Sequence, residues 1–504
     1  MEARRTESWD DSRTGQPAAA RPDTVADRAG DEKISMQTSI GAAMRPGPAR
    51  GADDLARRPR RRTAIGRAAA SLAACLLAPA AAAQAPIACF EEGTDPVVVE
   101  RTMASAMAAR SADPQPAIGT SGRWDSTALS GATGVEGDPV IVTWGIARES
   151  TVPGETTVIA AAFGPTEVTG ESELQAVFDG WFGDRATWIA LVQDAFDSWT
   201  DITGIEFVYE PNDDGRVIPT NGAAGAGIWG TRADIRIGGH FIDGAGGIVA
   251  YARPPDDGDI VLDTGDQSFF RDSSDNHVQF RNTVAHEIGH AMGLEHVCPA
   301  GAKTKLMEPS IVPDFDGPQH DDLVAMQDEY GDYGENDDDD VDAFDTGAGA
   351  GGTYVALDVS IDGSSDEDWV VIPPEPGLTV NVGVQPYGES YLFAQSILGS
   401  CSGTAPVLVD TLVAQDLAVQ IVAADGTTEI AFADGVGAGE GETLAGVVVS
   451  SGGFVRVVGD GADAPQLYDL SVQLVPEPAA GPSAVAALVT LSLLAKRRSR
   501  RLRG

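Results

Sequence analysis

The sequence predicts two folded parts, an α+β domain over residues 139–331 and an all-β sandwich over residues 346–474. Apolar residues recur at helical spacing around a histidine-rich stretch at residues 286–296. Short β-branched segments divided by glycine follow residue 345. An acidic run lies between the two parts, and we assign residues 332–345 to a solvated linker.

Composition and charge restrict the class of protein. The chain has 504 residues, of which 42% are hydrophobic, so it can form two domains with separate cores. Its net charge of −42 excludes nucleic-acid binding through a basic surface and is typical of a solvated extracellular protein. Four cysteines are too few for a disulfide scaffold in a chain of this length.

The N-terminal region has the pattern of an exported protein. Residues 1–56 are polar and are interpreted as a disordered extension or an over-long gene start. We predict a signal peptide over residues 57–85, where a basic run precedes an apolar stretch and small residues offer A-x-A cleavage points. Lipoprotein attachment at Cys75 is the second alternative. Residues 86–138 would then form a prosegment or a linker.

The stretch from His286 to His296 reads HExxHxxGxxH. On a helix, His286 and His290 are one turn apart on the same face and can bind one metal ion, while Glu287 is placed to hold a water molecule. Gly293 permits a left-handed backbone that ends the helix and lets His296 supply a third nitrogen. Three nitrogen ligands with one open position indicate catalytic zinc. Asp275 or Asn276 is the expected helix N-cap.

With Leu306-Met307-Glu308-Pro309 following it, this motif resembles that of the matrixin branch of the metzincin metallopeptidases. The resemblance extends over residues 139–331. Four further segments look like a long helix, two strands and a closing helix of that family: Leu191–Trp199, Thr203–Phe207, Ala233–Ile237 and Asp321–Gly331.

The resemblance implies a zincin-like α+β fold, with a twisted mixed sheet and the zinc helix beneath an open cleft. It implies a zinc-dependent endopeptidase acting on protein or peptide substrates, with Glu287 as the general base. Met307 would form the hydrophobic floor beneath the zinc. The wall of the specificity pocket is expected from Pro309, Ser310 and Ile311.

Two features of the family differ in this chain. Tyr251 and Val261 stand where histidines of a structural zinc site would be, so only His240 could match a ligand there, and we expect no structural zinc. Calcium is the alternative second cation because carboxylates suit it. The acidic positions of the family's calcium loop are occupied by Asp243, Asp263 and Asp266.

Many matrixins are kept latent by a cysteine in a prosegment motif. Cys89 precedes the catalytic domain, but the residues around it do not resemble that motif. Its thiolate could reach the zinc, whereas a free thiol or a disulfide with Cys298 is the preferred interpretation. Cys401 is the other candidate disulfide partner of Cys298, and Cys298 itself is an alternative inhibitory fourth ligand. The connectivity stays open.

The segment after the linker shows a β-sandwich pattern. Its expected strands are Tyr354–Ile361, Leu378–Val384, Leu417–Val422, Leu444–Val449 and Phe454–Val458. The motifs at Asp366–Trp369, Gly453–Val457 and Tyr468–Val472 resemble the bacterial pre-peptidase C-terminal domain. Such a domain would bind substrate or surface polymers, or stabilise and escort the enzyme.

Residues 475–504 resemble a PEP-CTERM sorting signal. Val475-Pro476-Glu477-Pro478 precedes an apolar stretch and a basic tail. The apolar stretch spans roughly 22 Å as a helix, short of the roughly 30 Å hydrocarbon core. A marginal membrane anchor is the alternative. We therefore expect contact with export and sorting machinery, transient membrane contact, and a location outside a Gram-negative cell, either secreted or on its outer membrane.

Two alternatives to an endopeptidase remain at this stage. One is another zinc hydrolase on the same scaffold. The other is a non-catalytic adhesion or binding protein that has kept the scaffold, against which the intact Glu287 argues.

Overall fold

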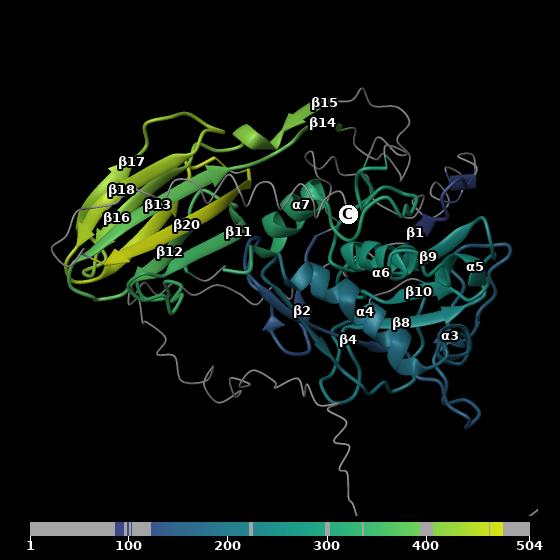
Figure 1. The fold of residues 1–504 in the computed structure, drawn as a ribbon. Coiled ribbons are helices and arrows are strands. Elements are labelled where there is room, and N and C mark those ends of the chain that lie inside the picture. The colour runs from purple at the N-terminus through teal and green to yellow at the C-terminus, as the bar shows by residue number, and fades with distance from the viewer. Residues whose placement is uncertain are drawn as a thin grey trace, which may run out of the picture. The chain divides into compact units, whose positions relative to one another are not determined.

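The computed structural model describes residues 86–94, 98–99, 102, 122–220, 225–297, 303–334, 337–393, 407–462 and 464–476 (Figure 1). The predicted N-terminal extension, the signal peptide and nearly all of the sorting segment lie outside these residues. In the ranges that are described, no helix has both the length and the apolar character needed to cross a membrane.

The first part of the chain is built on a six-stranded mixed sheet with the strand order β1-β9-β10-β8-β4-β7 (Figure 1). Its strands are β1 (Ile87–Phe90), β4 (Val140–Ile146), β7 (Ile205–Tyr209), β8 (Ile235–His240), β9 (Ile248–Ala252) and β10 (Ile260–Asp263). The four strands β7, β4, β8 and β10 are parallel, whereas β9 is antiparallel to β10 and β1 is antiparallel to β9. β1 is therefore an edge strand, although it lies in the range expected to be a prosegment or linker.

Helices cover one face of this sheet and enclose the main core. They are α3 (Leu174–Phe182), α4 (Arg185–Thr200), α5 (Gln267–Phe270), α6 (Val278–Ala291) and α7 (His320–Tyr330). Helix α4 begins at a capped end, because the Asp184 carboxylate accepts a hydrogen bond from the Thr187 backbone N–H at 2.8 Å. The indole of Trp199 on α4 donates to the Ala285 carbonyl on α6 at 3.0 Å, which ties the two helices together.

The opposite face of the sheet carries a smaller apolar cluster. Tyr251 and Val261 point into it from β9 and β10, together with Ile159 from a short strand and Phe163 and Ile218 from loops. Two short strand pairs complete this part, β2 (Ser126–Thr127) with β3 (Gly131–Ala132) and β5 (Val158–Ile159) with β6 (Gly170–Glu171). Because both faces are covered, the central strands β4, β8 and β10 are buried almost throughout.

The C-terminal part is mostly β, with two four-stranded antiparallel sheets of strand order β11-β20-β13-β18 and β12-β19-β16-β17. The first sheet contains β11 (Thr353–Ile361), β13 (Leu378–Pro386), β18 (Glu442–Val449) and β20 (Gln466–Pro476). The second contains β12 (Glu367–Ile372), β16 (Ala418–Ala423), β17 (Glu429–Ala433) and β19 (Gly453–Val458). One apolar core takes side chains from both sheets. A separate pair, β14 (Ser390–Phe393) with β15 (Val407–Asp410), precedes a 3-10 turn at Thr411–Val413.

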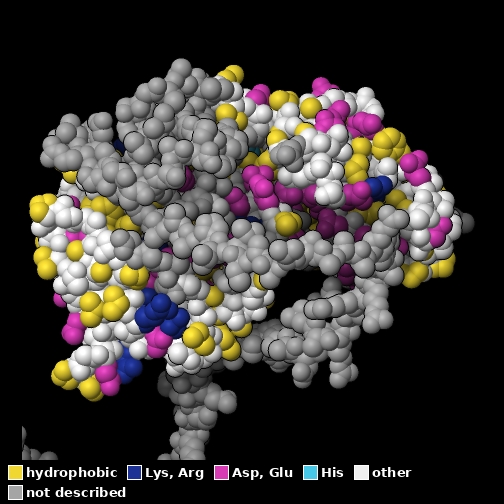
Figure 2. All heavy atoms as spheres, turned by 180° about the vertical axis from the view of Figure 1, so that it is seen from behind, with side chains coloured by type: hydrophobic (Ala, Val, Ile, Leu, Met, Phe, Trp, Pro, Cys, Tyr) yellow, Lys and Arg dark blue, Asp and Glu magenta, His cyan; other side chains and the backbone are white. Residues whose placement is uncertain are grey.

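Acidic side chains are spread over the face shown in Figure 2, where lysine and arginine form only small groups. This surface agrees with the net charge of −42. A basic patch that could track a nucleic-acid backbone is not seen on the described residues of this face.

Candidate active site

Helix α6 carries the first two predicted metal ligands. It begins at Val278 after His277, whose backbone is left-handed at φ 60° and whose side chain makes no cap hydrogen bond. The prediction of Asp275 or Asn276 as the N-cap is therefore wrong. Both residues also have positive φ, 45° and 57°, so the chain coils tightly before the helix starts.

The end of α6 turns the chain back toward the helix. Gly293 has φ 114°, and its N–H donates to the His290 carbonyl at 3.0 Å. The Leu294 N–H donates to the Gly289 carbonyl at 2.8 Å, which completes a Schellman motif. A Cβ at position 293 would lie 2.2 Å from the Gly122 carbonyl oxygen, so only glycine fits this turn. The reversal brings His296 over the helix.

The three predicted zinc ligands converge on one point. His296 Nε2 lies 3.1 Å from His286 Nε2 and 3.2 Å from His290 Nε2. All three side chains are buried. In a tetrahedral site with zinc–nitrogen bonds of 2.0–2.1 Å, two ligand nitrogens are separated by roughly 3.3 Å. The triad therefore has the dimensions of a zinc site.

Backbone carbonyls orient two of these rings. His286 Nδ1 is 2.6 Å from the Leu306 carbonyl oxygen, and His290 Nδ1 is 2.7 Å from that of Leu294. Each carbonyl accepts the Nδ1–H, so Nε2 carries the lone pair toward the centre. Burial lowers the pKa of His286 to about 4, which keeps the ring neutral, the form that binds a metal.

Glu287 lies beside the triad and is fully buried. Neither of its carboxylate oxygens accepts a hydrogen bond from an N–H or O–H group of the described residues. Burial raises its pKa well above the ordinary value, and the neighbouring Cys89 thiol acts in the opposite direction. A buried carboxylate that accepts no N–H or O–H group of the described residues, next to three candidate metal ligands, is available to a water molecule or a substrate group.

Met307 lies beneath α6, where the sequence expected the hydrophobic floor of the site. Its side chain is buried, and a Cβ on Gly289 would come within 2.5 Å of its Sδ. The glycine thus allows the turn that carries Met307 to approach the helix. Of the predicted pocket wall, Pro309 and Ile311 are buried and Ser310 is half-buried.

The three aspartates of the predicted calcium loop do not converge as the histidines do. Both oxygens of Asp263 accept backbone N–H groups, from Ile242, Asp243, Gly244 and Gly265. Asp266 is buried, and neither of its oxygens accepts a hydrogen bond. Burial, followed by the charges of Asp263 and Glu91, raises the pKa of Asp266 to about 8. Calcium binding at this loop stays a prediction.

A hydrogen-bonded cluster lies where the family's structural zinc would be. His240 Nε2 is 2.7 Å from Glu167 Oε1, and the Tyr251 hydroxyl donates to the same oxygen at 2.9 Å. Glu167 Oε2 accepts the Ala162 N–H at 2.6 Å. His240 is thus engaged with a carboxylate, and Tyr251 supplies a hydroxyl rather than an imidazole.

Cys89 is a free, buried thiol, so the disulfide alternative is wrong for this residue. Cys298 and Cys401 lie outside the described residues. The Cys89 sulfur, a ring nitrogen of His286 and a carboxylate oxygen of Glu287 lie within 4.8 Å of one another. Among described residues, this group and the histidine triad are the two clusters with metal-ligand spacing.

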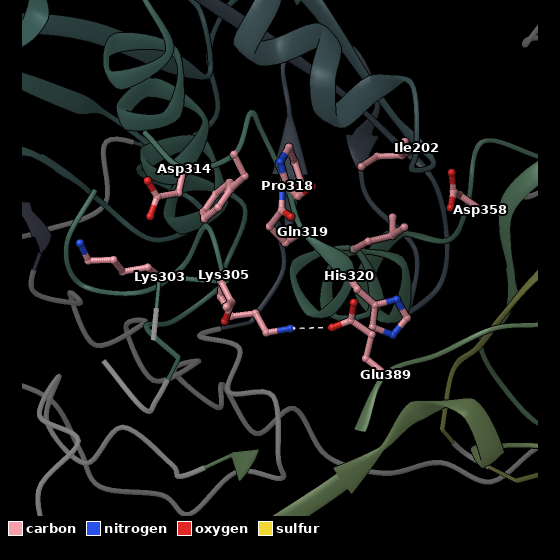
Figure 3. Close-up of a pocket in the computed structure, with 12 residues that line it drawn as sticks. Ile202, Lys303, Lys305, Asp314, Pro318, Gln319, His320, Asp358 and Glu389 are labelled. Atoms are coloured by element: carbon pink, nitrogen blue, oxygen red, sulfur yellow. Dashed lines mark hydrogen bonds and ion pairs between the residues drawn. The ribbon is translucent and has the colours of Figure 1, made fainter. Parts of the chain in front are cut away.

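A cavity of about 430 Å³ lies away from the triad (Figure 3). Lys305 and Glu389 form an ion pair of 3.3 Å at its edge, and His320 lines it from α7. None of the triad residues or Glu287 contributes to its lining. Its position argues against a role in metal-dependent chemistry.

Sequence reasoning gave too little weight to two residues that shape the site. Contact of the Cys89 thiolate with the zinc was an alternative ranked behind a free or paired thiol, and Asp322 was treated only as part of the closing helix. Asp322 accepts hydrogen bonds from the backbone N–H groups of Leu306 and Met307. Neither residue belongs to the histidine motif, so its spacing carried no signal for them.

Comparisons with known proteins agree with this geometry. Residues 183–331 match the model of the matrixin family. The hatching enzyme of Paracentrotus lividus is 28% identical over 151 residues, which cover 28% of this chain and 22% of that protein. The chain thus spans about a fifth of the length of this relative. Together with the mixed sheet and the histidine triad, these matches support a matrixin-type metallopeptidase domain with the α+β fold of that family.

Proposed function

We propose that the protein is a zinc-dependent endopeptidase. The convergence of the three imidazoles carries this proposal: His296 Nε2 lies 3.1 Å from His286 Nε2 and 3.2 Å from His290 Nε2, beside the buried Glu287. Zinc bound to the three imidazoles would supply Lewis acidity at its open coordination position.

The protein's own residues would carry out the remaining steps. Glu287 accepts a proton from the attacking water and returns it to the leaving amine. The Leu306 and Leu294 carbonyls hold two of the imidazoles in their ligand tautomer. Met307 supports the helix from below, and Pro309, Ser310 and Ile311 border the place where the substrate backbone would run.

The substrate is proposed to be an extended protein or peptide segment. Strand β9 packs against α6, and its outer edge, which could offer backbone groups to an extended peptide, is paired with β1. The relative named above is a hatching enzyme, but the chain covers too little of it to carry over a particular substrate.

We further propose that the protein acts outside the cell. The predicted signal peptide at residues 57–85 and the predicted sorting segment at residues 475–504 support this location. The C-terminal β part would then stabilise the enzyme or hold it near a surface polymer. Calcium remains a proposed second cation at Asp243, Asp263 and Asp266.

The test measures zinc content and cleavage on the same purified full-length chain. We expect one zinc per chain by mass spectrometry and cleavage of an unfolded protein that a chelator abolishes. Glu287→Gln is expected to keep the zinc and to lose roughly 100- to 10,000-fold in turnover. The conservative variant keeps the size of the side chain and removes only its proton-accepting oxygen.

Two results would overturn the proposal. A chain that does not retain zinc would remove its basis. A parent chain that binds zinc but cleaves no protein, so that it cannot be distinguished from Glu287→Gln, would favour the non-catalytic binding protein.

A further inference from the structure

Two buried side chains close the C-terminal end of α6, the helix that carries the first two predicted zinc ligands. Backbone N–H groups of the following turn bond to the carbonyls of residues 288–290, whereas the next two carbonyls accept from side chains. The Trp124 indole donates to the Ala291 carbonyl at 3.0 Å, and the Tyr330 hydroxyl donates to the Met292 carbonyl at 2.9 Å. Because the last carbonyls of a helix have no partners within it, these two side chains form a C-terminal cap.

The two capping residues are bonded to each other. Trp124 and Tyr330 are both fully buried. The Tyr330 hydroxyl accepts the Trp124 backbone N–H at 3.3 Å while it donates to the Met292 carbonyl, so two bonds fix its position. The Arg123 guanidinium lies 4.9 Å from the centre of the Tyr330 ring and donates to the Glu329 carbonyl at 2.8 Å. The cap therefore joins the end of α6 both to α7 and to a segment that the sequence assigned to a prosegment or linker.

The capped carbonyls lie at the start of the turn that returns His296 to the triad. Three residues separate Met292 from His296, and the first of them is Gly293, whose φ of 114° sets the direction of the turn. The Leu294 carbonyl, within the same segment, lies 2.7 Å from His290 Nδ1. A shift of the Met292 carbonyl would therefore displace both the backbone of His296 and the carbonyl that orients His290.

The segment is fixed on the far side of His296 as well. The Val297 N–H donates to the Met307 carbonyl at 2.9 Å. His296 thus lies between two anchor points, the capped end of α6 and the turn that carries Met307. Distances from a metal ion to its ligands vary by only about 0.2 Å, so a ligand outside a helix or strand needs a fixed backbone on both sides.

Building on the zinc site of the proposed endopeptidase, we propose that Trp124 and Tyr330 are positioning residues that hold the end of α6 so that His296 completes the metal site. Both act through backbone carbonyls and not as ligands. Loss of either donor leaves a buried carbonyl unsatisfied, and the turn must move to find a new partner for it. The histidine motif thus defines which residues bind the metal, and the cap defines where the third of them lies.

Two conservative replacements in the full-length chain each remove one donor. Tyr330→Phe deletes only the hydroxyl, and Trp124→Phe deletes the indole N–H with part of the ring. The matched controls are Tyr251→Phe and Trp188→Phe. Tyr251 donates its buried hydroxyl to a carboxylate on the opposite face of the sheet, and the buried Trp188 donates its indole N–H to a carboxylate on α3. Each control therefore loses a comparable side-chain hydrogen bond away from the end of α6.

Amide exchange of the zinc-free chains tests whether the cap holds the turn. The N–H groups of Gly293, Leu294 and Val297 all donate hydrogen bonds in the structure, so they should exchange slowly in the parent and in both controls. Tyr330→Phe and Trp124→Phe are expected to exchange about tenfold faster or more at these amides. Unfolding midpoints of the same zinc-free chains show that each is folded and how much stability it has lost.

Metal binding tests whether the held turn positions a ligand. Competition with a chromophoric chelator measures zinc affinity, and the visible absorption of Co²⁺ bound in place of zinc reports the coordination geometry. We expect Tyr330→Phe and Trp124→Phe to lose zinc affinity about 10- to 100-fold, as for other residues that orient a ligand, and to give a different cobalt spectrum. Tyr251→Phe and Trp188→Phe should keep both, because a loss of stability alone leaves the affinity of a folded chain unchanged.

Two results would overturn the inference. Zinc affinity and a cobalt spectrum like those of the parent in both Tyr330→Phe and Trp124→Phe would mean that the cap contributes packing only. An equal loss of affinity in Tyr251→Phe or Trp188→Phe would mean that affinity follows the stability of the whole domain.

Failure of the proposed function gives a different result. A parent chain that binds zinc and cleaves no protein would refute the endopeptidase, while zinc affinity and the cobalt spectrum still decide the role of the cap. A parent chain that binds neither ion would refute both proposals.

Discussion

Asp322 on α7 fixes the turn whose carbonyl orients His286. Its Oδ2 accepts the Leu306 N–H at 2.9 Å, and its Oδ1 accepts the Met307 N–H at 3.1 Å. The Leu306 carbonyl in turn lies 2.6 Å from His286 Nδ1. The Asp322 carboxylate on α7 thus positions His286, the first predicted zinc ligand, through Leu306.

Replacing Asp322 should therefore weaken zinc binding. Asp322→Ala leaves the buried Leu306 and Met307 N–H groups without their acceptor, so the turn moves and the His286 ring loses its fixed orientation. We expect zinc affinity to fall about 10- to 100-fold, as for other residues that orient a ligand. Competition with a chromophoric chelator measures the change. Asp322→Asn keeps one acceptor oxygen, so its zinc affinity should lie between those of the parent and Asp322→Ala. Equal affinity in all three chains would contradict this role of Asp322.

His290 should be indispensable for the metal. Removing its imidazole leaves two nitrogen ligands, too few for a stable zinc site. We expect His290→Ala to lose stoichiometric zinc and all chelator-sensitive cleavage. The matched control is His277→Ala, a histidine at the other end of α6 that is not part of the triad. Zinc retained at one ion per chain in His290→Ala would refute the ligand assignment.

Gly289 should be coupled to Met307. A Cβ at position 289 would lie 2.5 Å from Met307 Sδ and 3.0 Å from its Cε, so alanine must push the methionine away. Overpacking costs about 1–3 kcal/mol, which opposes a gain of about 1 kcal/mol in helix propensity. In a double-mutant cycle with Met307→Ala, denaturant unfolding should reveal a coupling energy of about 0.5–3 kcal/mol. Additive effects would show that the two residues do not press on each other.

Asp266 should make stability depend on pH. Its pKa is raised to about 8 by burial, with the Asp263 charge as the next cause, so the folded state binds a proton that the unfolded state has lost. Stability is then fully present below about pH 4 and falls as the pH rises toward 8. The difference in unfolding midpoint between Asp266→Asn and the parent should grow from pH 5 to pH 9 in favour of the variant. Added calcium should reverse this difference if the loop binds it.

A second group of aspartates should make the stability of the C-terminal part fall as the pH rises, as expected for Asp266. Burial, followed by repulsion from neighbouring aspartates, raises the pKa of Asp337 to about 8, of Asp362 to about 8 and of Asp366 to about 7. Their folded pKa values lie above the unfolded value, so this part should lose stability as the pH rises from about 4 to 8. Asp362→Asn should flatten the dependence of the unfolding midpoint on pH. Hydrogen bonds from Thr428 and Thr427 lower the pKa of the exposed Asp425 to about 2, so Asp425→Asn should leave this dependence unchanged between pH 4 and pH 8.

The spacing of apolar residues predicted correctly those helices and strands that pack one face against a core. The segment Leu191–Trp199 lies in α4, and Asp321–Tyr330 lies in α7. The five predicted strands of the C-terminal part correspond to β11, β13, β16, β18 and β19. In each case a run of apolar residues at the right period faces a core.

Two strands that the sequence analysis did not predict contain residues that disfavour a strand assignment. Strand β17 (Glu429–Ala433) is largely exposed, and its glutamate and alanines have low strand propensity. It forms because β16 presents a free edge to which its backbone can bond. Strand β12 begins with two acidic residues, and Asp368 is buried against the Tyr468 hydroxyl, an arrangement that single-sequence patterning reads as a turn.

The sequence by itself determined the local arrangement of the candidate metal ligands, because a few neighbouring residues set that arrangement. Helical periodicity places His286 and His290 on one face, and Gly293 supplies the left-handed turn that returns His296. What lies against this motif was decided only by the tertiary structure. Cys89 and Asp322 reach it from opposite ends of the domain, through the order of strands in the sheet and the packing of α7. Spacing along a chain carries information about contacts within one element, whereas contacts between distant segments depend on the packing of the whole core.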